Sequence, residues 1–276
     1  MSATAEPAPA PTPVAGPEHA EPAPPVARWR PRTAVGALVL GLALSQAFAL
    51  AVVLLHGGRG TDEVDGAAVL VSELPLLIVT ILFARRGAQR LTPATLGIRR
   101  TPFGAALGWA LAFYVGIVAA EGLYLLLVGD GGLGGEETAG SISTATAAMT
   151  IAGVAVVAPI AEEVAFRGYL FPALTTWRGP WIAALITAVL FAAAHLGAYP
   201  PQIAPMMVFF GLGACLLRWF TGSLLPCIGL HALNNGIVAA VALGALGAGA
   251  ILGSLAAPIV AVLLVLPLAR ERVTQD

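Results

Sequence analysis

Long apolar runs without charged residues constrain this chain more than any other feature. Two of them, Ala34–Leu55 and Ala248–Leu268, contain no charged residue, and each exceeds the roughly 18 residues that a helix needs to cross a bilayer. A backbone in lipid must satisfy its own hydrogen bonds, which leaves helices or closed barrels. The runs lack the alternating polarity of barrel strands. We therefore predict an all-α, polytopic membrane protein.

The amino-acid composition agrees with a membrane protein and argues against a soluble one. Hydrophobic residues make up 58% of the chain and charged residues 11%, whereas soluble domains carry about 25% charged residues. Such a chain cannot cover a soluble surface, so we expect membrane lipids around it. Its net charge of -1 gives no sign of nucleic-acid binding, and we expect no nucleic-acid partner.

The chain divides into an N-terminal tail and a membrane domain. Residues 1–27 are rich in Pro and Ala without a periodic apolar face, which is typical of a disordered tail. Residues 28–276 are expected to form a transmembrane helical domain of about eight helices around a cavity. The predicted spans are Ala34–Leu55, Ala67–Ala84, Gly104–Val128, Ala145–Ala161, Trp181–Leu196, Gln202–Trp219, Leu224–Leu243 and Ala248–Leu268.

The arginines orient this bundle. Basic residues of short loops face the cytoplasm, and with eight spans every arginine except Arg59 falls on one side. Seven or nine spans would break this separation. We therefore predict a multi-pass cell-membrane protein with its tail and both termini in the cytoplasm.

Polar residues gather in the predicted spans of the C-terminal half. Ionisable groups inside a membrane are costly and indicate functional sites. A single buried Glu–Arg pair or a single interhelical His is more often structural, but several polar groups that meet from three helices favour a site. The residues concerned are Glu162, Glu163, Arg167, His195, His231 and Asn235.

The spacing of these residues predicts how they meet. Glu163 and Arg167 are four residues apart, so they can pair on one helix face, while Glu162 is rotated by about 100° from Glu163 and can point elsewhere. The segment 177–180 (Trp-Arg-Gly-Pro) predicts a turn, and Glu162 and His195 lie at equal distances on either side of it. In an antiparallel hairpin these two residues therefore reach the same depth.

Three further polar residues in the spans have no obvious partner. Glu73 stands two residues before Pro75 in the second span, Glu121 near the outer end of the third, and Gln46 in the first. An interhelical hydrogen bond or a position near the interface is the simpler interpretation, with a place in a substrate cavity as the alternative.

Three short motifs resemble a known family. Residues 162–167 read EExxxR, residues 191–195 read FxxxH, and residues 231–235 read HxxxN. Together, in this order, they resemble the CPBP family of CAAX prenyl endopeptidases and bacteriocin-processing, Abi-like proteins, over roughly residues 144–240. The Abi-like motifs and the composition are typical of a bacterial protein.

This resemblance implies an intramembrane endopeptidase with a catalytic core at about residues 144–240. Glu162 and His195 would activate a water, His231 and Asn235 would stabilise the oxyanion, and Glu163 with Arg167 would support them. A carboxylate in a low-dielectric cavity is a stronger base than one in water, and His and Asn can donate hydrogen bonds to a developing oxyanion. The expected substrate is a membrane-embedded or lipid-anchored peptide or protein, which could itself be lipidated.

Zinc is the main alternative to metal-free, glutamic-type catalysis, because members of this family are often labelled metalloproteases. Its ligands would be Glu162, His195 and His231. The HExxH motif is absent, however, and no two histidines share a helix at ligand spacing. We therefore expect no cofactor.

Two other functions stay open. A non-catalytic bacteriocin-immunity or scaffolding membrane protein of the same fold would need only part of the polar set. A proton-coupled transporter could use Glu162 and His195 as a relay, but the two halves of the chain show no internal repeat of the kind on which many transporters are built. The complete set of six polar residues favours the protease.

Overall fold

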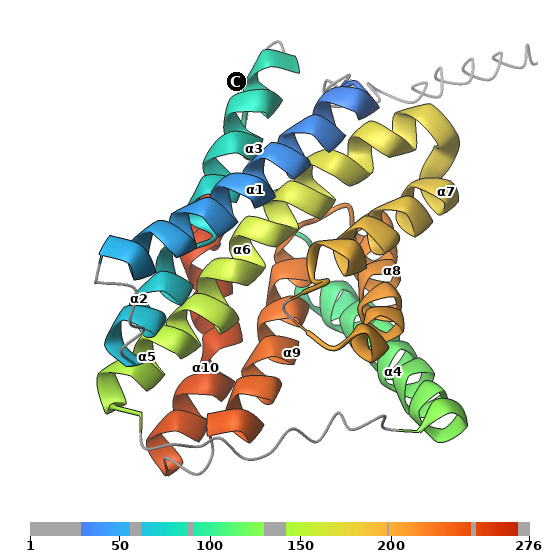
Figure 1. Cartoon of the computed structure of the whole chain (residues 1–276). Coiled ribbons are helices and arrows are strands. Elements are labelled where there is room, and N and C mark those ends of the chain that lie inside the picture. The colour runs from blue at the N-terminus through green and yellow to red at the C-terminus, as the bar shows by residue number, and fades with distance from the viewer. Residues whose placement is uncertain are drawn as a thin grey trace, which may run out of the picture.

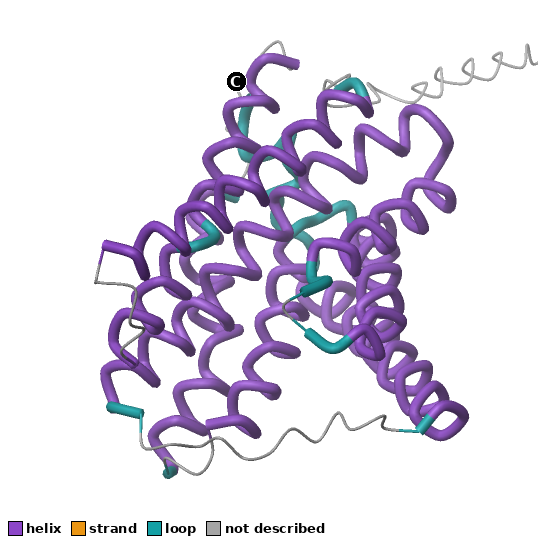
Figure 2. Tube along the Cα trace, in the orientation of Figure 1, coloured by secondary structure: helices purple, strands orange, loops and turns teal. Residues whose placement is uncertain are grey.

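The computed structural model describes residues 29–55, 62–87, 91–129, 142–197, 199–243 and 247–269. These residues are almost entirely helical and contain no β-strand (Figure 2). The all-α fold class is therefore confirmed. The tail predicted at residues 1–27 and both chain termini lie outside the described residues.

The helices pack mainly in neighbouring pairs, α1 with α3, α7 with α8, and α9 with α10, and α4 leans away from the bundle along α8 (Figure 1). The elements, in chain order, are α1 (Pro31–Leu55), α2 (Asp62–Val71), α3 (Leu74–Gly87), α4 (Phe103–Val128), α5 (Thr144–Ala152), the π-helix η1 (Gly153–Val157), α6 (Ala158–Glu163), the π-helix η2 (Val164–Leu170), α7 (Phe171–Ala194), the 3₁₀-helix η3 (Pro201–Ile203), α8 (Ala204–Thr221), α9 (Leu225–Leu243), α10 (Ala248–Val265) and the 3₁₀-helix η5 (Leu266–Leu268).

Seven helices in the described part of the chain are long and apolar enough to cross a membrane. One of them, Thr144–Ala194, is 51 residues long and loses helical geometry at Gly179, where φ is 77°. The sequence predicted a turn at this position. The chain reverses direction at Gly179, so the part of α7 after Gly179 runs back alongside the part before it (Figure 1). The two arms correspond to the predicted spans Ala145–Ala161 and Trp181–Leu196, so the count of eight crossings stays a prediction.

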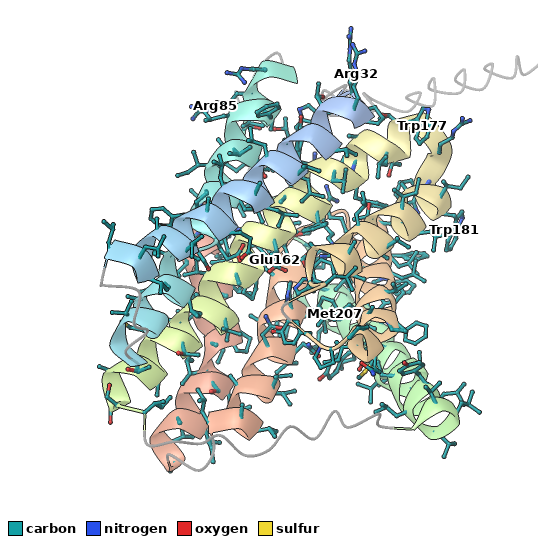
Figure 3. All side chains as sticks on the ribbon, viewed as in Figure 1. Arg32, Arg85, Glu162, Trp177, Trp181 and Met207 are labelled. Carbon is teal, nitrogen blue, oxygen red and sulfur yellow. The ribbon has the colours of Figure 1, made fainter. Side chains whose placement is uncertain are left out.

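The outer surface of the bundle is apolar and the interior is partly polar, the reverse of a soluble protein. Ile117 is the one buried residue of α4, whereas the charged side chains of Glu163 and Arg167 are fully buried. Lipid must therefore surround helices such as α4, as expected for a multi-pass membrane protein. Arg32, Arg85 and Trp177 lie toward one end of the bundle (Figure 3), as interfacial residues do.

The helix that carries the EExxxR motif is interrupted on both sides of the glutamates. α6 lies between the π-helices η1 and η2, and such wide turns are frequent at functional sites. Pro159, near the start of α6, has no N–H to donate to the carbonyl of Ala155, which loosens the helix at this point. Glu162 and Glu163 occupy the last two positions of α6.

The second predicted span is broken in the middle, between α2 and α3. Pro75 cannot donate to the carbonyl of Val71, and regular hydrogen bonding resumes where Leu77 N donates to Glu73 O at 3.2 Å. α2 packs against α5, and α3 packs against α6 and η2. The break at Glu73 therefore separates a helix that packs against α5 from one that packs beside the EExxxR motif.

A close approach of α7 and α8 completes the frame of the site. A Cβ atom on Gly211 of α8 would lie 2.9 Å from Ala188 Cα of α7, so no larger residue fits there without moving the helices apart. Small residues allow this kind of backbone contact between membrane helices. The approach also turns the Gly211 carbonyl toward η2.

Candidate active site

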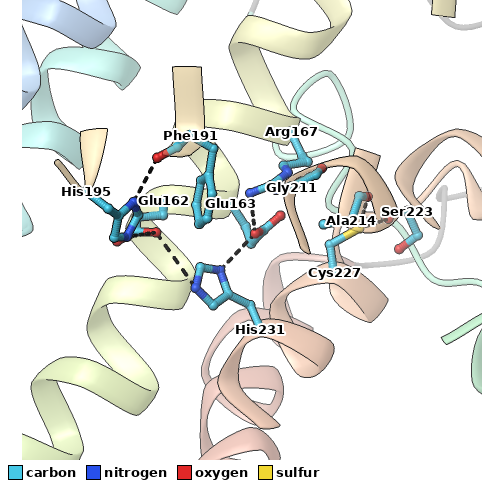
Figure 4. A network of polar contacts seen from close by, with 10 residues as sticks. All are labelled: Glu162, Glu163, Arg167, Phe191, His195, Gly211, Ala214, Ser223, Cys227 and His231. Atoms are coloured by element: carbon cyan, nitrogen blue, oxygen red, sulfur yellow. Dashed lines mark hydrogen bonds and ion pairs between the residues drawn. The ribbon is translucent and has the colours of Figure 1, made fainter. Parts of the chain in front are cut away.

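Three of the predicted site residues meet around one carboxylate oxygen (Figure 4). Glu162 Oε2 lies 4.0 Å from His195 Nε2 and 3.7 Å from His231 Nε2. The three side chains come from α6, from the C-terminal end of α7 and from α9. The hairpin around Gly179 thus brings Glu162 and His195 to the same depth, as their spacing predicted.

Hydrogen bonds at the other ring nitrogens fix how the two imidazoles are oriented. His195 Nδ1 lies 2.8 Å from Phe191 O, which can only accept, so Nδ1 carries a proton. His231 Nδ1 lies 2.9 Å from Glu163 Oε1 and donates to it. In its neutral form each ring therefore presents the lone pair of Nε2 to Glu162.

Glu163 contacts more of the site than the sequence indicated. Its Oε1 accepts from Arg167 Nη1 at 2.7 Å, as the i,i+4 spacing predicted, and from His231 Nδ1 as well. Both carboxylate partners are buried, and the exposed fraction of Glu163 and Arg167 is 0%. Glu163 is therefore held by a cation on one side and orients a catalytic candidate on the other.

Arg167 ties this site to α7 and α8. Its Nη2 donates to Gly211 O at 3.1 Å, and its guanidinium stands 4.6 Å from the centroid of the Phe191 ring. A buried charge is tolerated when it is paired and hydrogen-bonded. Arg167 thus holds three segments together while it compensates the charge of Glu163.

Asn235 follows His231 by one turn of α9, but its amide contacts a different group. Asn235 Nδ2 donates to Val154 O in the π-helix η1 at 2.9 Å. The side chain therefore fastens α9 to η1 next to the EExxxR helix. An amide has two N–H donors, so one remains for a ligand.

Aromatic rings form an apolar wall around the two imidazoles. The Phe191 ring centroid lies 4.7 Å from that of His195 and 5.7 Å from that of His231, and Phe210 lies 4.9 Å from His231. Tyr199 follows α7 and stands 6.0 Å from His195. Burial and the nearby charge of Glu162 raise the pKa of the Tyr199 phenol, so this group stays neutral at physiological pH.

Several residues of the site carry no signal that the sequence analysis used. Phe210 contributes a ring, and Gly211 and Val154 contribute backbone carbonyls. Because every residue has a backbone carbonyl, the sequence does not show which carbonyl will accept a hydrogen bond at the site. Glu73 interacts electrostatically with both Glu162 and His195, although the sequence offered it no partner. The break that Pro75 imposes on its helix was the available signal for Glu73.

The geometry also bears on the zinc alternative. Among the residues that the structure describes, no group of three or more His, Cys, Asp or Glu side chains is arranged to hold a metal ion. Glu162, His195 and His231 do converge, and the hydrogen bond from His231 Nδ1 to Glu163 leaves Nε2 of His231 facing Glu162. The choice between metal-free and zinc-dependent catalysis therefore stays a prediction.

Comparison with known proteins gives one match. Residues 144–237, about a third of the chain, match the family model described as "Type II CAAX prenyl endopeptidase Rce1-like". No curated protein and no solved structure matches the sequence. The matched segment contains all three motifs and the residues that meet around Glu162. This match supports the family resemblance predicted from the motifs: residues 144–237 of this membrane protein are similar to the type II CAAX prenyl endopeptidases.

Proposed function

We propose that this protein is a metal-independent intramembrane endopeptidase that hydrolyses a peptide bond of a membrane-embedded or lipid-anchored substrate. The observation that carries the proposal is the meeting of Glu162 with the Nε2 atoms of His195 and His231 in a largely apolar site. A transporter relay does not need two oriented imidazoles facing one carboxylate. A scaffold does not need them either.

In this proposal Glu162 and His195 activate the attacking water. The 4.0 Å between Glu162 Oε2 and His195 Nε2 is too long for a direct hydrogen bond, and one water placed beside both atoms can bond to each. Both atoms are acceptors when His195 is neutral, so each can accept a hydrogen bond from one O–H group of that water. The carboxylate takes a proton as the oxygen attacks the scissile carbonyl.

His231 and Asn235 then stabilise the oxyanion. The Glu163 carboxylate accepts from His231 Nδ1 and so holds the ring with Nε2 toward Glu162. Protonated at Nε2, His231 can donate to the oxyanion, and the second N–H of Asn235 can do the same. Arg167 holds Glu163 in position.

The substrate must reach the site from the membrane. The apolar outer surface and the apolar walls of the site are compatible with a peptide that carries apolar residues or a lipid group. We further propose that both termini face the cytoplasm, a topology that the position of Arg32 and Arg85 at one end of the bundle supports.

A reconstituted assay tests this function. The purified protein would be given a farnesylated CAAX peptide and a library of short membrane peptides, in parallel with Glu162→Gln and His195→Ala. We expect cleavage by the wild type and a loss of on the order of 100-fold or more in each variant, because each removes a group of the proton-transfer pair.

Folding must be checked in the same preparations. Glu121→Gln, on the outer helix α4, is the matched control for Glu162→Gln and should cleave like the wild type. Equal turnover in the wild type and the two site variants would contradict the proposal. So would the absence of cleavage by a folded wild-type protein across all the peptides.

A further inference from the structure

A small apolar recess borders the imidazole of His195 and has no part in the proposed water activation. Its volume is about 10 Å³, which is close to the space that one water molecule fills. The other side chains around it are apolar or aromatic and come from the end of α7, from the segment that follows α7 and from the first turns of α8. They include Ala192, Leu196, Tyr199, Ile203, Ala204 and Met207.

The antiparallel packing of α7 against α8 explains where the recess lies. At Gly211 the two backbones approach closely, because an added Cβ would lie 2.9 Å from Ala188 Cα. About one helical turn further along α7 is Ala192, and about one turn back along α8 is Met207. These two residues line the recess together. The short side chain of Ala192 leaves space there, and Met207 limits that space from the side of α8.

The segment between α7 and α8 is held at two points. Leu196 and Tyr199 form an isolated β-bridge, and Tyr124 Oη of α4 donates to Gln202 O at 3.0 Å. This side of the recess is therefore preformed. Met207 packs only partly buried against the core, and methionine is unbranched and adaptable. The size of the recess thus depends mainly on Met207.

The recess lies within reach of the bond to be cleaved. His195 Nε2 is 4.0 Å from Glu162 Oε2, and a water between them must come within about 3.5 Å of the scissile carbon. Successive residues of an extended peptide are about 3.3–3.6 Å apart. The side chain of a residue next to the scissile bond therefore reaches the recess, which borders the same imidazole.

We propose that the recess binds this side chain and that Met207 limits its size. This inference rests on the proposed function and makes Met207 a specificity-determining residue of the same site. The volume of about 10 Å³ suits the methyl group of an alanine. One methylene more or less in an apolar pocket changes discrimination by about 10-fold to 200-fold. The wild type should therefore prefer Ala to Leu or Phe at one position next to the scissile bond.

A series of peptides that differ in the size of one side chain tests this role. The peptide that the wild type cleaves fastest would be remade with Gly, Ala, Val, Leu or Phe on either side of the scissile bond, one position at a time. The wild type, Met207→Ala and Met207→Phe would be compared by kcat/KM. Met206→Ala is the matched control, because Met206 is rotated by about 100° on α8 and does not belong to the described lining of the recess.

We expect Met207→Ala to enlarge the recess and to raise the preference for Leu over Ala by about 10-fold to 200-fold. Met207→Phe should fill the recess and lower the rate for Ala relative to Gly. Met206→Ala should keep the wild-type preferences. The Gly peptide places no side chain in the recess, so all four proteins should cleave it at similar rates. Its cleavage also shows that the variants are folded.

Several results would overturn the role of Met207 while the protease function stands. They are an unchanged size preference in Met207→Ala, the same change in Met206→Ala, or a wild type that prefers Leu or Phe to Ala at both positions. Loss of cleavage of the Gly peptide in both Met207 variants would also overturn it, because a specificity residue does not affect a substrate without a side chain. A wild-type protein that cleaves none of the peptides would contradict the proposed protease function itself.

Discussion

Glu163 Oε1 lies 2.9 Å from His231 Nδ1, and both side chains are buried. This contact joins the first and the last of the three motifs, which are separated by 68 residues in the chain. A buried carboxylate at one ring nitrogen sets the tautomer and the orientation of an imidazole. The second glutamate of EExxxR is thus a partner of His231 as much as of Arg167.

The first prediction concerns this pair. Glu163→Gln should lower kcat by on the order of 100-fold or more, as removal of an orienting carboxylate does in other hydrolases. If Glu163 acts through His231, the double variant Glu163→Gln with His231→Ala should be no slower than the slower single variant. Steady-state kinetics on the cleaved peptide measure this. Losses that multiply in the double variant would show that the two residues act separately.

The second prediction concerns Asn235. Asn235→Ala should lower kcat by about 10²-fold to 10³-fold, the cost of losing one oxyanion donor, with little change in KM. The neighbouring Asn234→Ala is the matched control and should retain activity, because Asn234 lies on another face of α9. A loss of thermal stability without a selective loss of kcat would contradict the oxyanion role. It would show that Asn235 acts only through its hydrogen bond with Val154 O.

The third prediction concerns the contact of α7 with α8. Gly211→Ala places a Cβ 2.9 Å from Ala188 Cα, and such overpacking costs about 1–3 kcal/mol. The unfolding temperature in detergent should fall, and activity should fall with it because Arg167 loses its geometry at the Gly211 carbonyl. Gly108→Ala on α4 is the control, since its added Cβ meets nothing within 4 Å. Equal melting of both variants would contradict the packing argument.

The fourth prediction concerns metals. Turnover should persist after incubation with EDTA or 1,10-phenanthroline, because no step of the proposed reaction uses a metal ion. Peptide cleavage before and after chelation, followed by addition of Zn²⁺, gives the measurement. Activity that disappears with the chelator and returns with Zn²⁺ would replace the glutamic mechanism with a metalloprotease.

The sequence predicted the site mainly through arithmetic along helices. Glu162 and His195 stand at equal distances from the turn that contains Gly179, and the structure brings their side chains within 4.0 Å. Membrane helices make such counting dependable, because their backbone hydrogen bonds are satisfied internally and their length is set by the bilayer. The helical fold and the pairing of Glu163 with Arg167 followed from the same regularity.

What the sequence did not predict depends on departures from that regularity. The contact of Glu163 with His231 requires the rotation of α9 about its axis, which no spacing within α9 reveals. The position of Glu73 depends on a helix break, and the partner of Asn235 is a carbonyl in a π-helix. These features follow from the packing of irregular segments. Counting residues along the chain predicts side-chain positions only where the helix is regular.

The two π-helical segments on either side of α6 make the site sensitive to chain length. A π-turn accommodates one residue more than an α-turn. The segments η1 and η2 therefore contain extra residues immediately before and after the glutamates. Deleting one residue from η1 would let the helix tighten and would rotate α6 by about 100° relative to α5. Glu162 would then turn away from His195 although every motif residue was still present. Within this helix, the number of residues is as much a part of the active site as their identity.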